Sequence, residues 1–232
     1  VKVPLDIGKN TVWVQAFDRQ GKILDFKDIR ALRLMTYPDV PATYWAYDQI
    51  NYIGTLGIIK GYPDGGFKPE GNITRAELST LLVRTQAGGE ENVPKSVRLM
   101  FKDVPFKHWA VNYINQAAET GLVKGYPGKI FKPSDNISRV EGLTMTARFG
   151  KVSEEAYTQH FLDVLESHWA AKIVTGAYNQ GLLEHFRRKP FEPKRKLTRA
   201  EAVEILYRTA PIQAQIQDLR NFEKDYEHSP PK

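Results

Sequence analysis

Three arginines occupy the same place in three nearly identical hexapeptides, and an arginine at that place is able to bind an anion. The hexapeptides are NITRAE, NISRVE and KLTRAE, and their arginines are Arg75, Arg139 and Arg199. Each is expected in the first turn of a helix, where the helix dipole disfavours a cation by roughly 0.3–1 kcal/mol. A counter-charge is therefore required. It is either an internal aspartate or an external anion held by the guanidinium fork and the free amides of the helix start, and the spacing alone leaves both hypotheses open.

The hexapeptides belong to a longer unit that the chain contains three times. In each copy the arginine lies 30 residues after a tryptophan, a glutamate follows at 32 residues, and an aspartate precedes the tryptophan by six. A Phe-x-Pro lies between the tryptophan and the arginine. This constant spacing, at a period of 60 to 64 residues, indicates three copies of one structural unit. The tryptophans are Trp45, Trp109 and Trp169, and the aspartates are Asp39, Asp103 and Asp163.

Two helices and a connecting loop are expected to position the arginine in each copy. The first helix begins near the tryptophan and stops at a glycine, which tolerates a left-handed backbone. These glycines are Gly57, Gly121 and Gly181. After a loop of the type GYPDGGFKP, the second helix opens with a capping box, in which a Thr or Ser and the Glu three residues later satisfy each other's backbone amides. The capping box explains those two positions and leaves the arginine between them unexplained.

The two ends of the chain differ from the repeats. Within residues 1–36, NTVWVQAFD alternates as a half-buried strand would, and a turn at DRQG leads to a second strand candidate. This hairpin resembles the last strands of a bacterial immunoglobulin-like domain. After the third copy, Ile212, Ile216, Leu219 and Phe222 recur at helical spacing, which predicts an amphipathic helix packed back on the repeats. The final EHSPPK is expected to be a frayed end.

Composition narrows the class of protein without naming a ligand. The chain has 232 residues, no cysteine and a net charge of +6, which excludes disulfides and thiol chemistry and favours anionic partners. No apolar run approaches the roughly 18 residues of a membrane span, so we expect no membrane insertion. The chain opens on strand-like sequence rather than a signal peptide, which is typical of a mature or excised piece.

Together the Asp-to-Trp spacing, the GYPDGGFKP loop and the ITRAE hexapeptide resemble the S-layer homology (SLH) repeat over residues 37–209. The resemblance implies a mainly α fold, in which three tandem helix-loop-helix repeats form a pseudo-threefold bundle with grooves between them. It also implies an extracellular module of the bacterial cell surface. Such modules attach proteins to the envelope non-covalently, commonly through an anionic secondary cell-wall polysaccharide that carries ketal-linked pyruvate. The expected units are residues 1–36 (hairpin), 37–99, 100–159 and 160–209 (repeats) and 210–232 (helix and tail).

The resemblance also implies where the polysaccharide binds. The best ligand candidates are Arg75, Arg139 and Arg199, supported by loop residues that let the backbone approach a sugar or add polar contacts. These loop residues are Gly61, Asp64, Gly65, Lys68, Gly125 and Lys132. The three tryptophans are interpreted as core anchors and left out of the site. The three aspartates are expected to cap the first helix or to pair with an arginine.

The third copy departs from the pattern, because it has HFRRKPFEP where the first has GYPDGGFKP. His185 replaces Gly61 and Phe186 replaces Tyr62. A groove built on this loop is expected to be dead, altered or more basic. Binding is therefore expected to concentrate on one or two grooves.

Other functions have weaker support in the sequence. No serine elbow, phosphate-binding loop or helical His pair appears, so we expect no enzymatic activity, no cofactor and no metal site. The basic segment 185–196 lacks any recognised nucleic-acid motif, and nucleic acid is not expected as a partner. The alternative from another class is a structural protein–protein module that joins neighbouring S-layer subunits in a surface lattice.

Overall fold

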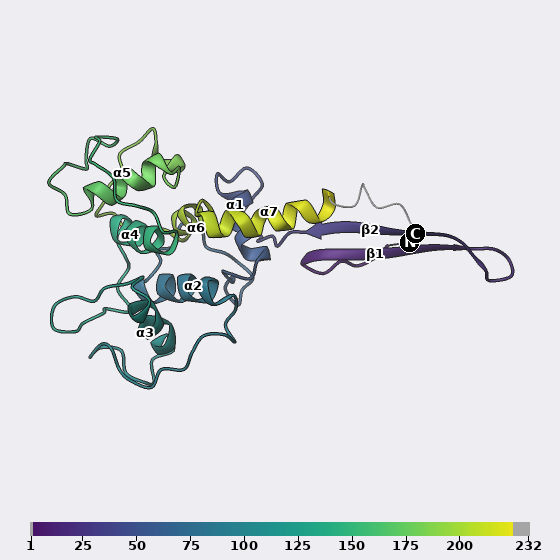
Figure 1. The fold of residues 1–232 in the computed structure, drawn as a ribbon, viewed down its shortest axis with the longest axis horizontal. Coiled ribbons are helices and arrows are strands. Elements are labelled where there is room, and N and C mark those ends of the chain that lie inside the picture. Colours follow the sequence, from purple (N-terminus) through teal and green to yellow (C-terminus); the bar gives the residue numbers. More distant parts are fainter. Residues whose placement is uncertain (1, 225–232) are drawn as a thin grey trace.

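The structure, a computed structural model, describes residues 2–224, and the expected frayed end EHSPPK lies outside them. Within that range the chain is mainly helical, with one two-stranded antiparallel sheet near its N-terminus, as predicted (Figure 1). The elements are β1 (Gly8–Phe17), β2 (Ile23–Arg33), α1 (Tyr47–Thr55), α2 (Arg75–Ala87), α3 (Val111–Glu119), α4 (Arg139–Phe149), α5 (Ala171–Asn179), a 3-10 turn η1 (Glu184–Phe186), α6 (Arg199–Tyr207) and α7 (Ala210–Lys224). Each copy of the repeat thus supplies one helix pair: α1 with α2, α3 with α4, and α5 with α6.

The second helix of every copy begins as the capping box predicts. In α2 the Thr74 hydroxyl accepts a hydrogen bond from the Glu77 amide, and the Glu77 carboxylate accepts one from the Thr74 amide. The same reciprocal pair opens α4 and α6. Two otherwise unpaired amides are satisfied at each start, so the arginine is fixed as the first helical residue. The first helices end near Gly57, Gly121 and Gly181, whose φ angles of 69°, 76° and 79° confirm the expected left-handed stops.

Hydrogen bonds between the copies join the segments that precede the second helices. The amide of Ile73 donates to the carbonyl of Leu197, that of Leu197 to Ile137, and that of Ile137 back to Ile73. All three side chains are buried in the main hydrophobic core. The phenylalanines of the Phe-x-Pro motifs, Phe67, Phe131 and Phe191, are also completely buried. The conserved spacing of the three copies therefore places equivalent residues around one shared core.

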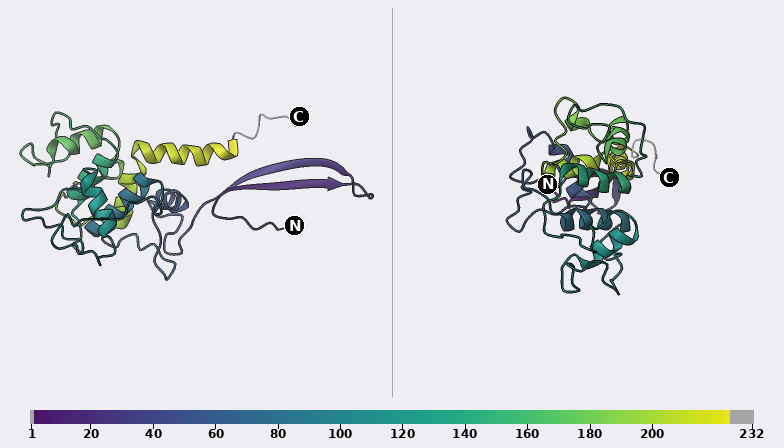
Figure 2. Two further views of the ribbon diagram at one scale, coloured as in Figure 1. Left: turned by 60° about the horizontal axis from the view of Figure 1, so that its bottom comes forward. Right: turned by 90° about the vertical axis from the view of Figure 1, so that its left-hand side faces the viewer.

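The N-terminal hairpin forms as predicted, but it is not half-buried. It projects from the helical part of the molecule (Figures 1 and 2), and β1 pairs with β2 so that Val12 lies opposite Ile29. Trp13, Val14, Phe17 and Phe26 are exposed. The expected burial is wrong because the hairpin extends beyond the helices of the repeats. Among the helices, α7 packs against it.

The predicted C-terminal helix is present as α7, with Ile212, Ile216 and Leu219 buried. It packs on α6 and also on the hairpin, mainly on β2. The cationic groups of Lys9 and Arg30 form cation–π contacts with the Phe222 ring, and Lys9 forms an ion pair with Asp218 at 2.7 Å. The apolar stripe of α7 therefore connects the repeats to the hairpin, rather than packing only on the repeats as expected.

Candidate functional site

The three repeated arginines are buried, and each reaches from its own copy into the loop of another. Arg75, Arg139 and Arg199 are 4%, 2% and 6% exposed. Each guanidinium donates to the carbonyl of a Phe-x-Pro phenylalanine: Arg75 to Phe131, Arg139 to Phe191 and Arg199 to Phe67. Each also lies over aromatic rings of that loop, including Tyr126 for Arg75, Phe186 for Arg139 and Tyr62 for Arg199. The arginine at the helix start thus holds two copies together.

The aspartates before the tryptophans have a different role from either expected one. Asp103 accepts hydrogen bonds from the backbone amides of Phe131 and Lys132, at 2.8 and 2.6 Å, and Asp39 and Asp163 do the same in their own copies. The first helices have no side-chain cap, and within residues 2–224 the ion pairs of Arg75 and Arg139 involve only glutamates. Both expectations are therefore wrong. These hydrogen bonds to the aspartate hold the loop at the point where its backbone becomes left-handed, with a φ of 60° at Lys132.

Replacing Asp103 with asparagine should lower the free energy of unfolding by about 1–3 kcal/mol, because one of two charge-assisted bonds is lost and an amide NH₂ faces a backbone donor. Urea denaturation monitored by circular dichroism measures the change. Asp135→Asn is the matched control, since the Asp135 side chain is 61% exposed, and it should change stability by less than about 0.5 kcal/mol. Equal effects of the two substitutions would contradict this role for Asp103.

The three arginines differ in how completely the protein neutralises them. Arg139 forms an ion pair of 2.7 Å with Glu201, and both side chains are buried. Arg75 lies 3.7 Å from Glu141. Arg199 has no carboxylate within 4.0 Å among the described residues. A buried cation without a carboxylate is costly unless an anion reaches it, so Arg199 and, to a lesser degree, Arg75 are suited to an external anion.

A tyrosine binds the same Glu141 oxygen that lies nearest to Arg75. The Tyr126 hydroxyl donates to Glu141 at 2.6 Å, and the carboxylate also accepts bonds from Ser138. Burial, followed by this bond, raises the pKa of Tyr126 to about 12, so the phenol remains a donor. Partial burial alone would raise the pKa of Glu141, but Ser138, Tyr126 and Arg75 outweigh it and hold this pKa below its ordinary value. Glu141 is therefore ionised, and its Oε1 both accepts the Tyr126 bond and lies 3.7 Å from the Arg75 guanidinium.

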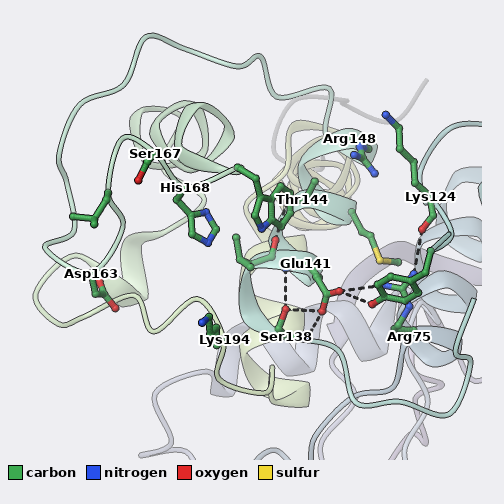
Figure 3. A pocket seen from close by; sticks show the side chains of 15 residues that line it. Arg75, Lys124, Ser138, Glu141, Thr144, Arg148, Asp163, Ser167, His168 and Lys194 are labelled. Carbon is green, nitrogen blue, oxygen red and sulfur yellow. Dashed lines mark hydrogen bonds and ion pairs between the residues drawn. The ribbon is translucent and has the colours of Figure 1, made fainter.

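Two grooves lie beside these less neutralised arginines. The first groove, of about 240 Å³, lies along α2 and includes Lys60, Glu77, Arg84, Trp109 and Arg199. The second groove, of about 1160 Å³, lies along α4 and includes Arg75, Lys124, Glu141, Arg148, Trp169 and Lys194. Figure 3 shows the second groove, with Glu141 and Ser138 on its floor, Arg148 and Lys124 towards one end and Lys194 and His168 towards the other. Each groove combines residues from all three copies.

The tryptophans are the residues that sequence reasoning assigned wrongly. Trp109 and Trp169 are 61% and 65% exposed and line the grooves, so the expectation of core anchors is incorrect. They precede Ala110 and Ala170, the N-caps of α3 and α5, and therefore lie outside the helices. An exposed indole provides a flat apolar face for a sugar ring. The sequence contained no signal for this exposure, because the helix starts at Val111 and Ala171 are known only from the structure.

The remaining predicted ligand residues are not among the residues that line the two grooves. Asp64 and Lys68 pair at 3.0 Å, and Lys68 and Lys132 lie over Tyr62 and Tyr126. Gly65 has a φ of 82° and supports the turn. Gly61 and Gly125 are needed for packing: a Cβ at Gly125 would lie 2.3 Å from the Phe101 ring. Lys60, Lys124, Arg148 and Lys194 were not predicted and line the grooves instead.

Comparison with known proteins agrees with this repeat architecture. The family described as the S-layer homology domain matches residues 36–79 and 101–141. These two segments match the S-layer homology domain and correspond to the first and second copies of the repeat. No helix among residues 2–224 is long and apolar enough to cross a membrane, and no cluster of three metal-ligating side chains occurs in the same range.

Three curated relatives show the contexts in which similar chains occur. A cellulosome-anchoring protein of Acetivibrio thermocellus is 34% identical over 155 residues, which cover 65% of this chain and 35% of the relative. S-layer protein EA1 of Bacillus anthracis is 32% identical over 74% of this chain and 20% of its own length. An amylopullulanase of Thermoanaerobacterium thermosulfurigenes is 30% identical over 70% of this chain and 9% of its own length. The chain thus spans about a third or less of these relatives.

Proposed function

We propose that this chain is a non-catalytic module of the bacterial cell surface that anchors a protein by binding an anionic envelope polysaccharide. The observation that carries the proposal is Arg199, a buried cation with no carboxylate within 4.0 Å among residues 2–224, which lines a groove together with the exposed Trp109 and with Glu77. The second groove repeats the combination with Arg75 and Trp169. The Nε and one terminal nitrogen of Arg199 donate to the carbonyls of Phe67 and Lys60, so the other terminal nitrogen is the donor proposed for a ligand carboxylate. The indole face is proposed to pack on the apolar face of a sugar. A sugar carrying an acidic group fits both.

The ligand class follows from charge and shape. Lys60 and Arg84, which also pair with Glu90 at 3.9 and 3.1 Å, add cations to the first groove. Lys124, Arg148 and Lys194 add cations to the second groove, against two lining acids. A pyruvate ketal places a carboxylate directly on a sugar ring. Such a sugar suits a groove in which an arginine and an exposed tryptophan lie together. The three copies are proposed to form one pseudo-threefold unit, supported by the reciprocal bonds among Ile73, Ile137 and Leu197.

The proposal is tested by calorimetric titration of the chain with isolated wall polysaccharide, before and after chemical removal of its pyruvate. We expect the affinity to fall at least tenfold without pyruvate, which corresponds to about 1.4 kcal/mol or more. Raising the salt concentration should also weaken binding, because the charges at the groove rims are screened. Equal affinity for both polymers would show that the pyruvate carboxylate is not recognised and would contradict this part of the proposal.

The exposed hairpin supports a second candidate, a protein–protein module of a surface lattice. Both of its faces carry exposed apolar side chains, among them Trp13 and Phe26 on one face and Val14 and Ile29 on the other. Absence of binding to either polymer, together with concentration-dependent self-association in analytical ultracentrifugation, would favour this function over the anchor.

A further inference from the structure

At the third position, the tryptophan and the arginine that correspond to those of the two grooves are in contact with the protein's own side chains. The equivalent tryptophan, Trp45, stacks on His185 with ring centroids 3.5 Å apart and an interplanar angle of 18°. Its exposed fraction is 37%, compared with 61% for Trp109 and 65% for Trp169. His185 stands where the first two copies have Gly61 and Gly125. The imidazole therefore covers an indole face that is open in the other grooves.

The arginine at this position, Arg139, is already neutralised by a carboxylate of the protein. Arg139 donates to Glu201 at 2.7 Å, whereas the equivalent Glu141 is held by Tyr126 and lies 3.7 Å from Arg75. In the third copy the tyrosine is replaced by Phe186, which has no hydroxyl to hold the glutamate. Glu201 lies against Arg139, and its side chain is 7% exposed compared with 30% for Glu141.

The charged residues around the third position also differ from those in the first two copies. Glu204 is buried and pairs with Arg208, at a position where the first two copies have Thr80 and Thr144. Burial, followed by the positive charge of Lys189, lowers the pKa of His185 to about 4. The ring is therefore neutral at neutral pH, and its Nε2 lies 2.5 Å from the Lys189 ammonium. A neutral ring lies flat on the indole without bringing a further charge next to Arg139.

We infer that His185 and Phe186 close the third groove from within, so that the chain offers two polysaccharide-binding grooves rather than three. This inference rests on the proposed function and adds a determinant to it. The imidazole occupies the face where a sugar ring would pack, and the Glu201 carboxylate occupies the place of the ligand's anion. The pair Gly-Tyr in the first two copies leaves a groove open, and His-Phe closes it.

The test restores the open pair with the double substitution His185→Gly and Phe186→Tyr. The probe is a methyl glycoside of a single hexosamine that carries a ketal-linked pyruvate, titrated calorimetrically at fixed protein concentration. The wild-type chain is expected to bind about two equivalents and the double variant about three. Arg188→Ala, an exposed change in the same loop, is the matched control and should retain about two.

A second measurement keeps the inference separate from the proposed function. In a chain where Trp13, Trp109 and Trp169 are replaced by phenylalanine, acrylamide quenching reports on Trp45 alone. Quenching should increase at least twofold in His185→Ala, which removes the ring even where the double variant fails to fold. Three equivalents in the wild type, or unchanged quenching in His185→Ala, would overturn the closure. No binding by any chain together with increased quenching would overturn the proposed function and leave the closure standing.

Discussion

Replacing Arg139 with alanine is expected to lower the free energy of unfolding by about 3–5 kcal/mol. The substitution leaves the Glu201 carboxylate, only 7% exposed, without its cation, and it removes the donor to the Phe191 carbonyl. A buried charge that loses its partner keeps its desolvation cost, which is why the loss exceeds that of an exposed ion pair. Urea denaturation measured by circular dichroism and by tryptophan fluorescence determines the change.

Two controls separate this explanation from a general effect of losing an arginine. Arg195→Ala removes an arginine that is 53% exposed and paired with Glu192, and it should cost less than about 1 kcal/mol. Adding Glu201→Gln to Arg139→Ala should recover part of the lost stability, because the capping box tolerates glutamine and no unpaired charge remains. A loss below about 1 kcal/mol for Arg139→Ala, or no recovery in the double variant, would refute the buried ion pair as the cause.

The local structure of the repeats was predictable because neighbouring residues determine it. The capping boxes at Thr74, Ser138 and Thr198 depend on residues three apart, and the glycine stops depend on a single backbone conformation. Local pattern also predicted the strands of the hairpin. It did not predict their exposure, since burial depends on what lies against a sheet rather than on its own alternation.

The site required tertiary information that one copy of the repeat does not contain. Arg75 meets the loop of the second copy and Arg199 meets the loop of the first, so the partners of each arginine lie about 50 to 130 residues away in the chain. The spacing predicted an unusual cation but not which carboxylates would reach it. Substitution in the third loop was visible in the sequence, and the stacking of His185 on Trp45 was not, because these residues come from different copies.

The grooves can be tested through the residues that the sequence assigned to the core. Trp109→Ala combined with Trp169→Ala should weaken polysaccharide binding by about 2 kcal/mol at each groove, or roughly thirtyfold in affinity. Both indoles are more than half exposed, so their loss removes ligand contact without opening the core. Thermal unfolding should therefore remain close to that of the wild type, in contrast to Arg139→Ala.

Trp45→Ala is the matched control for these two substitutions. It removes the same side chain at the third position, where His185 already covers the ring, so affinity for the pyruvylated polysaccharide should change by less than about threefold, or roughly 0.7 kcal/mol. Titration calorimetry of the three chains under one salt concentration makes the comparison. If Trp45→Ala weakened binding as much as the paired substitution, the third position would be an active groove. If the paired substitution left affinity unchanged, the polysaccharide would have to bind away from both indoles, and the arginines would serve only to join the copies.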